Sequence, residues 1–240
     1  MFRHRGKNRT FQHNLKIASL LSFVAGIVNV TGLFAVQQLT TNVTGHFAFF
    51  ADEMAQQHFS IAWVYLFYII AFFSGAFCSS FIVEAMLRKN ARLTYIMPVS
   101  IEIAILLFIG CLNLQMVAQY GNAIACSLLF AMGLQNALVT SLSNAVVRTT
   151  HLTGLFTDLG IEVSQLFFYR RREQKEKLTS SIRLRLTIIS FFFLGCIAGS
   201  AFYFVYGILS LVLAAIVLAG GLVYDYVKFR VVQLKRRFLG

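Results

Sequence analysis

Apolar residues run along this chain in long blocks that are separated by short polar or basic segments. A helix needs about 20 mostly apolar residues to cross the hydrocarbon core of a bilayer. The pattern predicts six such spans, which cover residues 17–36, 60–83, 94–113, 121–142, 186–205 and 207–225. The last two spans are almost continuous in sequence, so we expect the chain to turn at Gly207.

The composition agrees with a membrane protein. Of the 240 residues, 58% are hydrophobic and 12% are charged, whereas soluble domains carry about 25% charged residues. A chain with so few charges cannot cover a soluble globule, and the same composition excludes a disordered, collagen-like or coiled-coil protein. The four cysteines lie singly inside apolar stretches. They predict neither a zinc site nor a disulfide framework, and no metal or cofactor is expected.

The formal net charge of +12 would suggest a nucleic-acid partner if the protein were soluble. Here all 21 Lys and Arg residues lie in the two terminal segments, between the second and third spans, or between the fourth and fifth. Six spans place these segments on one side of the membrane, and the positive-inside rule makes that side the cytoplasm. We therefore expect the lipid bilayer as a partner, no nucleic acid, and both termini in the cytoplasm.

Two segments, residues 37–59 and 143–169, combine Thr, Gly and Asn with short apolar runs and fit neither loops nor spans. Within them, TTNVTGHF (40–47) and TTHLTGLF (149–156) are identical at five of eight positions. In each preceding span the match continues with a glycine and an asparagine, namely Gly26 and Asn29 in the first and Gly133 and Asn136 in the fourth. This similarity predicts an internal repeat.

The repeat divides the chain into two halves of three spans each. An odd number of spans gives the halves opposite orientations in the membrane, which is the arrangement of inverted-repeat transporters. The predicted fold class is therefore all-α, a polytopic integral membrane protein with six transmembrane helices as two inverted three-helix repeats with broken or re-entrant segments. The expected divisions are a basic tail (1–16), two repeats (17–113 and 121–225), a basic cytoplasmic linker inside the second repeat (170–185) and a second basic tail (226–240).

In inverted-repeat transporters, broken helices meet near the bilayer midplane and direct their N-termini at the ligand. Threonine can cap the first turn of such a helix, and glycine allows a sharp bend or a close approach. The repeat thus predicts a set of substrate-binding residues: Asn29, Thr41, Thr44, Gly45, Asn136, Thr150, Thr153, Gly154 and Asp158. The alternative is that both segments are interfacial helices with threonine caps and no ligand, and that the asparagines hydrogen-bond across helices.

Glu102 lies in the third predicted span, four residues after Pro98. An ionisable residue inside a span is costly, so it is a candidate site for a coupling proton or cation. The alternative is a carboxylate near the membrane interface that pairs with Arg88, Lys89 or Arg92.

Asp158 and Glu162 are four residues apart and share one face of a helix that is expected to begin near Thr157. That face either lines a central cavity or belongs to an amphipathic cytoplasmic helix. Arg148, just before the second Thr-Gly motif, could bind an anion together with the helix N-terminus. It could equally pair with Asp158 or simply mark the cytoplasmic side.

The sequence GIVNVTGLF in the first span, followed by TTNVTGHF, resembles the opening of YoaK-type bacterial membrane proteins. GLQNALVTSLSN, followed by VRTTHLTGLFTDLG, resembles the second half of the same proteins. The family is catalogued as a domain of unknown function, number 1275, and the resemblance extends from Ala18 to Tyr224. It implies six spans in a bacterial inner (plasma) membrane and no established substrate. The family pattern has an acidic residue after the first-span asparagine, whereas Val30 follows Asn29 here, which argues against a proton-carrying carboxylate in the first span.

Together these features predict a secondary transporter or permease for a small solute, with an anion as one option. The alternative is a non-transporting membrane scaffold or accessory subunit whose polar segments bind a partner or a lipid. Known hydrolytic and nucleotide-binding motifs are absent from the sequence, so no catalytic residues and no enzyme activity are expected. A homo-oligomer is left open.

Overall fold

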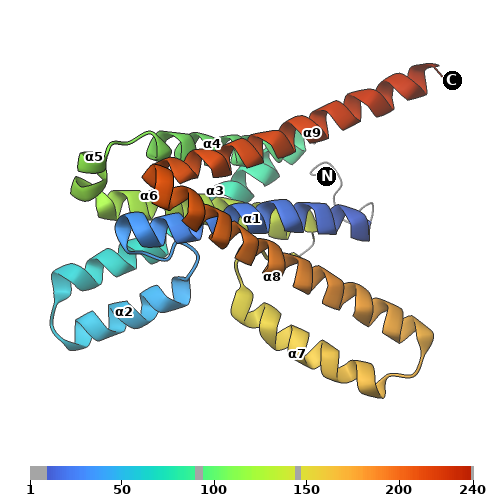
Figure 1. Cartoon of the computed structure of the whole chain (residues 1–240), viewed down its shortest axis with the longest axis horizontal. Coiled ribbons are helices and arrows are strands. Elements are labelled where there is room, and N and C mark those ends of the chain that lie inside the picture. Colours follow the sequence, from blue (N-terminus) through green and yellow to red (C-terminus); the bar gives the residue numbers. More distant parts are fainter. Residues whose placement is uncertain (1–9, 90–93, 144–146, 239–240) are drawn as a thin grey trace.

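The computed structural model describes residues 10–89, 94–143 and 147–238, and these residues form helices without any strand. The elements are α1 (Phe11–Val36), α2 (Val43–Ala55), α3 (Phe59–Lys89), α4 (Ile96–Gly110), α5 (Leu114–Gln119), α6 (Gly121–Ser143), α7 (Leu152–Phe168), α8 (Arg172–Tyr206), the 3₁₀ turn η2 (Gly207–Leu209) and α9 (Ser210–Phe238). Figure 1 shows long helices lying along one axis of the molecule, with α2 and α7 as shorter helices on one side of it. The all-α class is therefore confirmed.

Four segments of the described chain are long and apolar enough to cross a membrane. They are Phe11–Val36, Phe59–Leu87, Gly121–Ser143 and Arg172–Lys228. The last contains α8 and most of α9, and the chain turns between these helices at Gly207, whose φ of 60° is in the left-handed region, as predicted. Apolar helices of this length indicate a membrane protein, while a total of six spans stays a prediction.

Helix boundaries differ from the predicted spans in three places. α4 has 15 residues, fewer than the predicted third span, because the chain leaves the helix after Gly110 and Asn113 then caps α5. The segment 170–185, expected to be a cytoplasmic linker, is mostly helical because α8 already begins at Arg172, and its cytoplasmic location stays a prediction. α9 likewise continues to Phe238 through most of the expected C-terminal tail.

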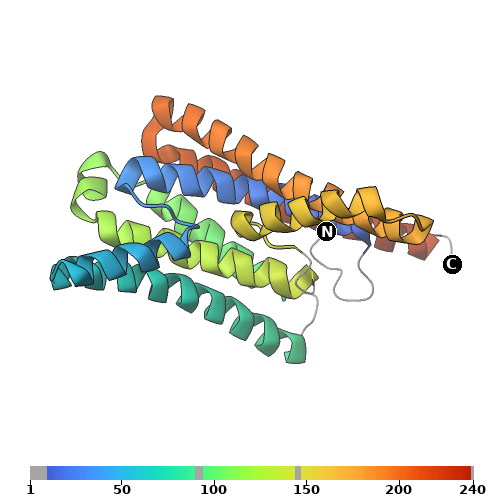
Figure 2. The ribbon, with the colours of Figure 1, turned by 90° about the horizontal axis from the view of Figure 1, so that it is seen from below.

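The helices α2 and α7 are only 13 and 17 residues long. After α1 the chain folds back toward the middle of the long axis before α2 starts, and α7 also starts near the middle. From there α2 and α7 run toward opposite ends of the molecule, as Figures 1 and 2 both show. These two helices occupy the segments whose sequences matched each other.

The most extensive helix contacts are α1 against α8 and α3 against α6. Further contacts join α1 to α9, α4 to α6, and α4 to α9. Each of the two main pairs has a glycine on both helices, Gly26 with Gly195 and Gly75 with Gly133. A Cβ at any of these positions would collide with a backbone carbonyl oxygen of the partner helix. The paired helices therefore pack backbone to backbone, as small residues allow in membrane proteins.

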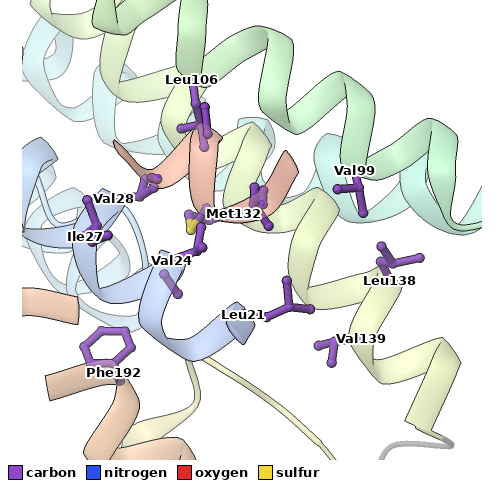
Figure 3. Close-up of a cluster of buried hydrophobic side chains, with 14 of the residues drawn as sticks. Leu21, Val24, Ile27, Val28, Val99, Leu106, Met132, Leu138, Val139 and Phe192 are labelled. Carbon is purple, nitrogen blue, oxygen red and sulfur yellow. The ribbon is translucent and has the colours of Figure 1, made fainter. Parts of the chain in front are cut away.

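The central helices α1 and α6 are the most buried of the long helices. In each, 61% of the most apolar 18-residue stretch is buried inside the molecule. Figure 3 shows their core side chains, such as Val24 and Met132, together with Leu106 of α4 and Phe192 of α8. The outer helices instead expose large apolar side chains, for example Phe73 on α3 and Phe204 on α8, at 67% and 78% of their surface. Exposed apolar surface on this scale fits contact with lipid.

Candidate functional site

The chain segments before α2 and α7 are each held by an asparagine of the preceding long helix. Asn29 Oδ1 accepts hydrogen bonds from the Thr41 backbone N–H at 3.2 Å and from the Thr41 hydroxyl at 2.9 Å. In the other half, Asn136 Nδ2 donates to Thr150 Oγ1 at 2.5 Å, and its Oδ1 accepts from Thr149 Oγ1 at 3.2 Å. The structure thus joins two of the predicted residues in each half, and the Asn29–Thr41 and Asn136–Thr150 side-chain bonds link matched positions of the repeat.

The first turns of α2 and α7 are built around a glycine that makes room for the residue at the N-cap. Asn42 caps α2, and its Oδ1 accepts a hydrogen bond from the Gly45 backbone N–H at 3.0 Å. At α7 the N-cap is His151, whose ring lies where a Cβ of Gly154 would be. Neither cap is a threonine, so the predicted threonine caps are wrong. The close approach expected at each glycine is made by the cap residue itself.

The remaining predicted threonines, Thr44 and Thr153, are exposed in the first turns of α2 and α7. Figures 1 and 2 both place the starts of these two helices near each other, close to the middle of the molecule. Gly154 and Asp158 line one cleft of the molecule. A single pocket that also holds Asn29, Thr44 and Gly45 stays a prediction.

That cleft has a volume of about 730 Å³ and opens between the start of α1, the start of α7 and the first half of α8. It lies toward the end of the molecule where α8 begins, which we call the basic end because α8 starts with Arg172 and carries Lys175, Lys177 and Arg183 there. Its lining residues are Phe11, Asn14, Arg148, His151, Gly154, Leu155, Asp158, Ser180, Ser181, Leu184 and Arg185. The cleft is therefore polar on the side of α7 and α8.

A charge network joins α7 to α8 beside this cleft. Arg185 Nη1 donates to Asp158 Oδ2 at 2.8 Å, and Arg185 Nε donates to Glu162 Oε2 at 2.8 Å. Arg185 Nη2 and the Ser181 hydroxyl both donate to Glu162 Oε1, at 3.0 and 2.6 Å. The acidic face of α7 is therefore turned toward α8. The helix itself begins at Leu152 rather than near Thr157.

Arg148 does not pair with Asp158, which is bonded to Arg185 instead. The Arg148 side chain is exposed, lines the cleft, and has no ion-pair partner among the residues that the structure describes. The network sets one guanidinium, that of Arg185, against two carboxylates, of which only Asp158 lines the cleft. Among the described lining residues, the two arginines Arg148 and Arg185 therefore outnumber the single acidic residue, and Arg148 is the one without an ion pair.

Glu102 lies on the buried face of α4, with only 1% of its surface exposed. Its Oε1 atom has no hydrogen-bond partner within the described part of the chain. The basic residues of the expected pairing lie outside the described part of the chain, since the structure describes neither Arg92 nor the side chains of Arg88 and Lys89. Glu102 is thus in the interior of the helix bundle rather than at its end.

Several polar residues of the interior were not predicted. Gln135 donates to the Leu21 carbonyl at 3.1 Å, and Thr31 bonds to Ser210 at 2.9 Å, which joins α1 to α9. His46 is buried in α2, where its Nε2 lies 3.0 Å from the Leu39 carbonyl oxygen and its ring faces Tyr68. Gln135 could have been found because it is a neighbour of Asn136, whereas a lone histidine carries no comparable signal in sequence.

Among the residues that the structure describes, no cluster of three or more His, Cys, Asp or Glu side chains could hold a metal ion. The described cysteines are free thiols.

Comparison with known proteins identifies the family but no relative of known activity. No curated protein and no solved structure matches the chain. A family model described as "Protein of unknown function (DUF1275)" matches residues 17–224. This range includes the Asn–Thr contacts, Glu102 and the residues of the cleft that follow α1, whereas Phe11 and Asn14 of the cleft lie before it. Because the match covers most of the sequence, the chain belongs to the DUF1275 family of proteins of unknown function.

Proposed function

We propose that the protein is a secondary transporter or permease for a small anionic solute, built from two inverted repeats in a bacterial inner membrane. The observation that carries the proposal is the pair of half-length helices α2 and α7, which start near the middle of the long axis and run to opposite ends. Helices that start at membrane depth are tolerated where they line a cavity or are buried in protein. In inverted-repeat transporters such helices form the substrate site.

The helix contacts support the inverted repeat. In the predicted repeat, α1 corresponds to α6, α3 to α8, and α4 to α9. The α1–α8 contact then corresponds to the α6–α3 contact, and the α1–α9 contact corresponds to the α6–α4 contact. The same correspondence relates the Gly26–Gly195 pair to the Gly133–Gly75 pair, and the Asn29–Thr41 contact to the Asn136–Thr150 contact. Two halves that share one set of contacts are what a repeat with opposite orientations requires.

The charge of the cleft supports an anion as the solute. Arg148 is exposed there beside the N-terminus of α7, which carries a partial positive charge. Arg185 bonds to both carboxylates of the network, whereas Arg148 has no ion-pair partner among the described residues. A solute that carries a carboxylate, phosphate or sulfate group would therefore find an unpaired guanidinium at this position.

Uptake by the purified protein in proteoliposomes tests the proposal, with radiolabelled acetate, phosphate and sulfate as probes of the three anion classes. We expect uptake of at least one probe above protein-free vesicles. Arg148→Gln should raise the KM for that probe about tenfold or more, because a hydrogen bond to a charged group contributes about 1.5–3 kcal/mol. Lys177→Gln is the matched control, since Lys177 is exposed and does not line the cleft.

Two results would contradict the proposal. If none of the three probes enters the vesicles while the protein remains folded, anion transport is wrong, and the scaffold alternative gains support. If Arg148→Gln and Lys177→Gln have equal effects, the cleft is not the binding site. The fraction of folded protein, measured by gel filtration for each variant, separates lost binding from lost structure.

A further inference from the structure

Glu102 occupies the middle of α4, on the face that packs against α6 and α9. Val99 and Leu106, one turn away on either side, are fully buried on the same face. Figure 3 shows both of them within the core that also contains Met132 and Leu138 of α6. From α9, Ala215 and Leu218 belong to the same buried cluster. The carboxyl group of Glu102 therefore projects into an apolar part of the bundle.

Few titratable groups lie on the elements packed against Glu102. The described residues of α6 include only Cys126, and η2 has none. Glu84 of α3 is exposed. Tyr95, the N-cap residue of α4, lies two turns before Glu102, and its hydroxyl donates to Asp225 Oδ2 of α9 at 3.1 Å. Both residues of this Tyr95–Asp225 pair are buried between α4 and α9. The pair lies on the side of Glu102 that faces the basic end.

The surroundings of Glu102 decide which ion it can bind. An ionised carboxylate without a partner in an apolar interior is far more costly than a neutral carboxylic acid. A metal cation would need several oxygen ligands, and the described residues hold no cluster of three or more acidic, His or Cys side chains. A proton needs only the one carboxyl group.

We propose that Glu102 is a proton-binding site and carries a proton in this conformation. Release breaks the O–H bond, leaves the electron pair on the carboxylate and passes the proton to water that enters beside the Tyr95–Asp225 pair. The further statement that this proton is the coupling ion of transport rests on the proposed function, whereas the existence of the site does not.

Infrared spectroscopy of the full-length protein in lipid nanodiscs tests the site directly. At neutral pH we expect the carbonyl stretching band of a protonated carboxyl group, which shifts in D₂O and disappears reversibly as the pH is raised. Glu102→Gln should remove this band. Glu84→Gln is the matched control, because Glu84 is an exposed glutamate on the neighbouring helix α3, and it should leave the band unchanged. Absence of the band from the wild type, or its persistence in Glu102→Gln, would overturn the proposal.

The coupling role has a separate readout. Proteoliposomes that contain a pH-sensitive dye are given acetate, phosphate or sulfate in turn, and the internal pH is followed. With the wild type, we expect protons to move together with the transported probe. With Glu102→Gln, we expect the probe to move without protons. Equal proton movement in both proteins would overturn the coupling role. If none of the probes is transported at all, the proposed function fails, while the infrared result still decides whether Glu102 binds a proton.

Discussion

Asn29 and Asn136 show how single residues place the two short helices. Each asparagine lies in a long helix and bonds to a threonine in the connection that follows it. A backbone that leaves a helix inside a membrane protein has polar groups that need partners, since lipid offers none. Asn29 provides such a partner for the Thr41 backbone N–H before α2, whereas Asn136 holds the connection before α7 through the hydroxyl groups of Thr149 and Thr150.

Removal of these hydroxyl groups should weaken the fold. Thr41→Val and Thr150→Val each delete a bonded hydroxyl at nearly constant volume, and we expect each to lower the free energy of unfolding by about 0.5–1.5 kcal/mol. Thr44→Val is the control, because Thr44 is exposed in the first turn of α2. Urea or thermal unfolding in detergent measures all three. A loss in Thr44→Val as large as in Thr41→Val would show that the Asn–Thr contacts are not the cause.

Much of the residue-scale chemistry could be predicted, and some could not. The matched asparagines and threonines stand out because the chain repeats them, and the structure then joins them within each half. Arg185 did not stand out, because it lies among many basic residues whose common property is their side of the membrane. Its role depends on α8 packing beside α7, which is a tertiary contact between residues 23 and 27 positions apart.

At the scale of elements, glycines decide which helices can approach closely. Gly26 and Gly195 bring α1 and α8 together, and Gly75 and Gly133 do the same for α3 and α6. The colliding atoms that a Cβ would meet are backbone atoms, which cannot rotate away. Without a hydrophobic driving force between helices in lipid, this close contact is a main source of association.

Alanine substitutions should therefore have opposite effects at packed and open glycines. We expect Gly195→Ala and Gly133→Ala to destabilise the protein by about 1–3 kcal/mol, the usual cost of overpacking. Gly160→Ala and Gly220→Ala are matched controls within helices, because nothing lies within 4 Å of a Cβ there. These controls should be neutral or gain up to about 1 kcal/mol from helix propensity. Thermal melting in detergent checks the four variants, and equal melting temperatures would contradict the packing argument.

The long helices follow from hydrophobic blocks, but the limits of several elements do not. The segment 170–185 is polar and basic, and it was expected to be a linker, yet it forms the first part of α8. The helix α7 lies along one face of this first part of α8, where Arg185 and Ser181 donate hydrogen bonds to Glu162. Hydropathy measures the affinity of a segment for lipid, and it does not report whether a polar segment is helical against a neighbouring helix.

At the scale of the whole molecule, charge is distributed unevenly between the two ends. The described ends of α3 and α9 and the starts of α1 and α8 carry Lys or Arg residues, whereas Asp52 and Glu53 lie in the last turn of α2. An excess of basic residues on one side of a membrane marks the cytoplasmic side. The bundle therefore has the charge asymmetry expected of a protein with both termini in the cytoplasm.

Reporter fusions test this orientation. A fusion after Glu176, in the basic first part of α8, should report a cytoplasmic location with alkaline phosphatase inactive and green fluorescent protein fluorescent. A fusion after Met116, in α5, should give the reverse, because α4 and α6 lead to and from the opposite end. Phosphatase activity at Glu176 would contradict the predicted topology.

The sequence by itself determined the all-helical class, the apolar segments, the turn at Gly207, the uneven charge and the repeated Asn, Thr and Gly positions. These are local properties, since hydropathy, a left-handed turn and a repeat can each be evaluated without knowledge of the neighbours. Only the tertiary structure decided that Glu102 is buried with no hydrogen-bond partner for its Oε1 atom among the described residues, that Arg185 bonds to both carboxylates on one face of α7, and that cap residues fill the space beside Gly45 and Gly154. Such features depend on which distant segments pack together, and helix packing is set by the shape of whole surfaces rather than by any single stretch of sequence.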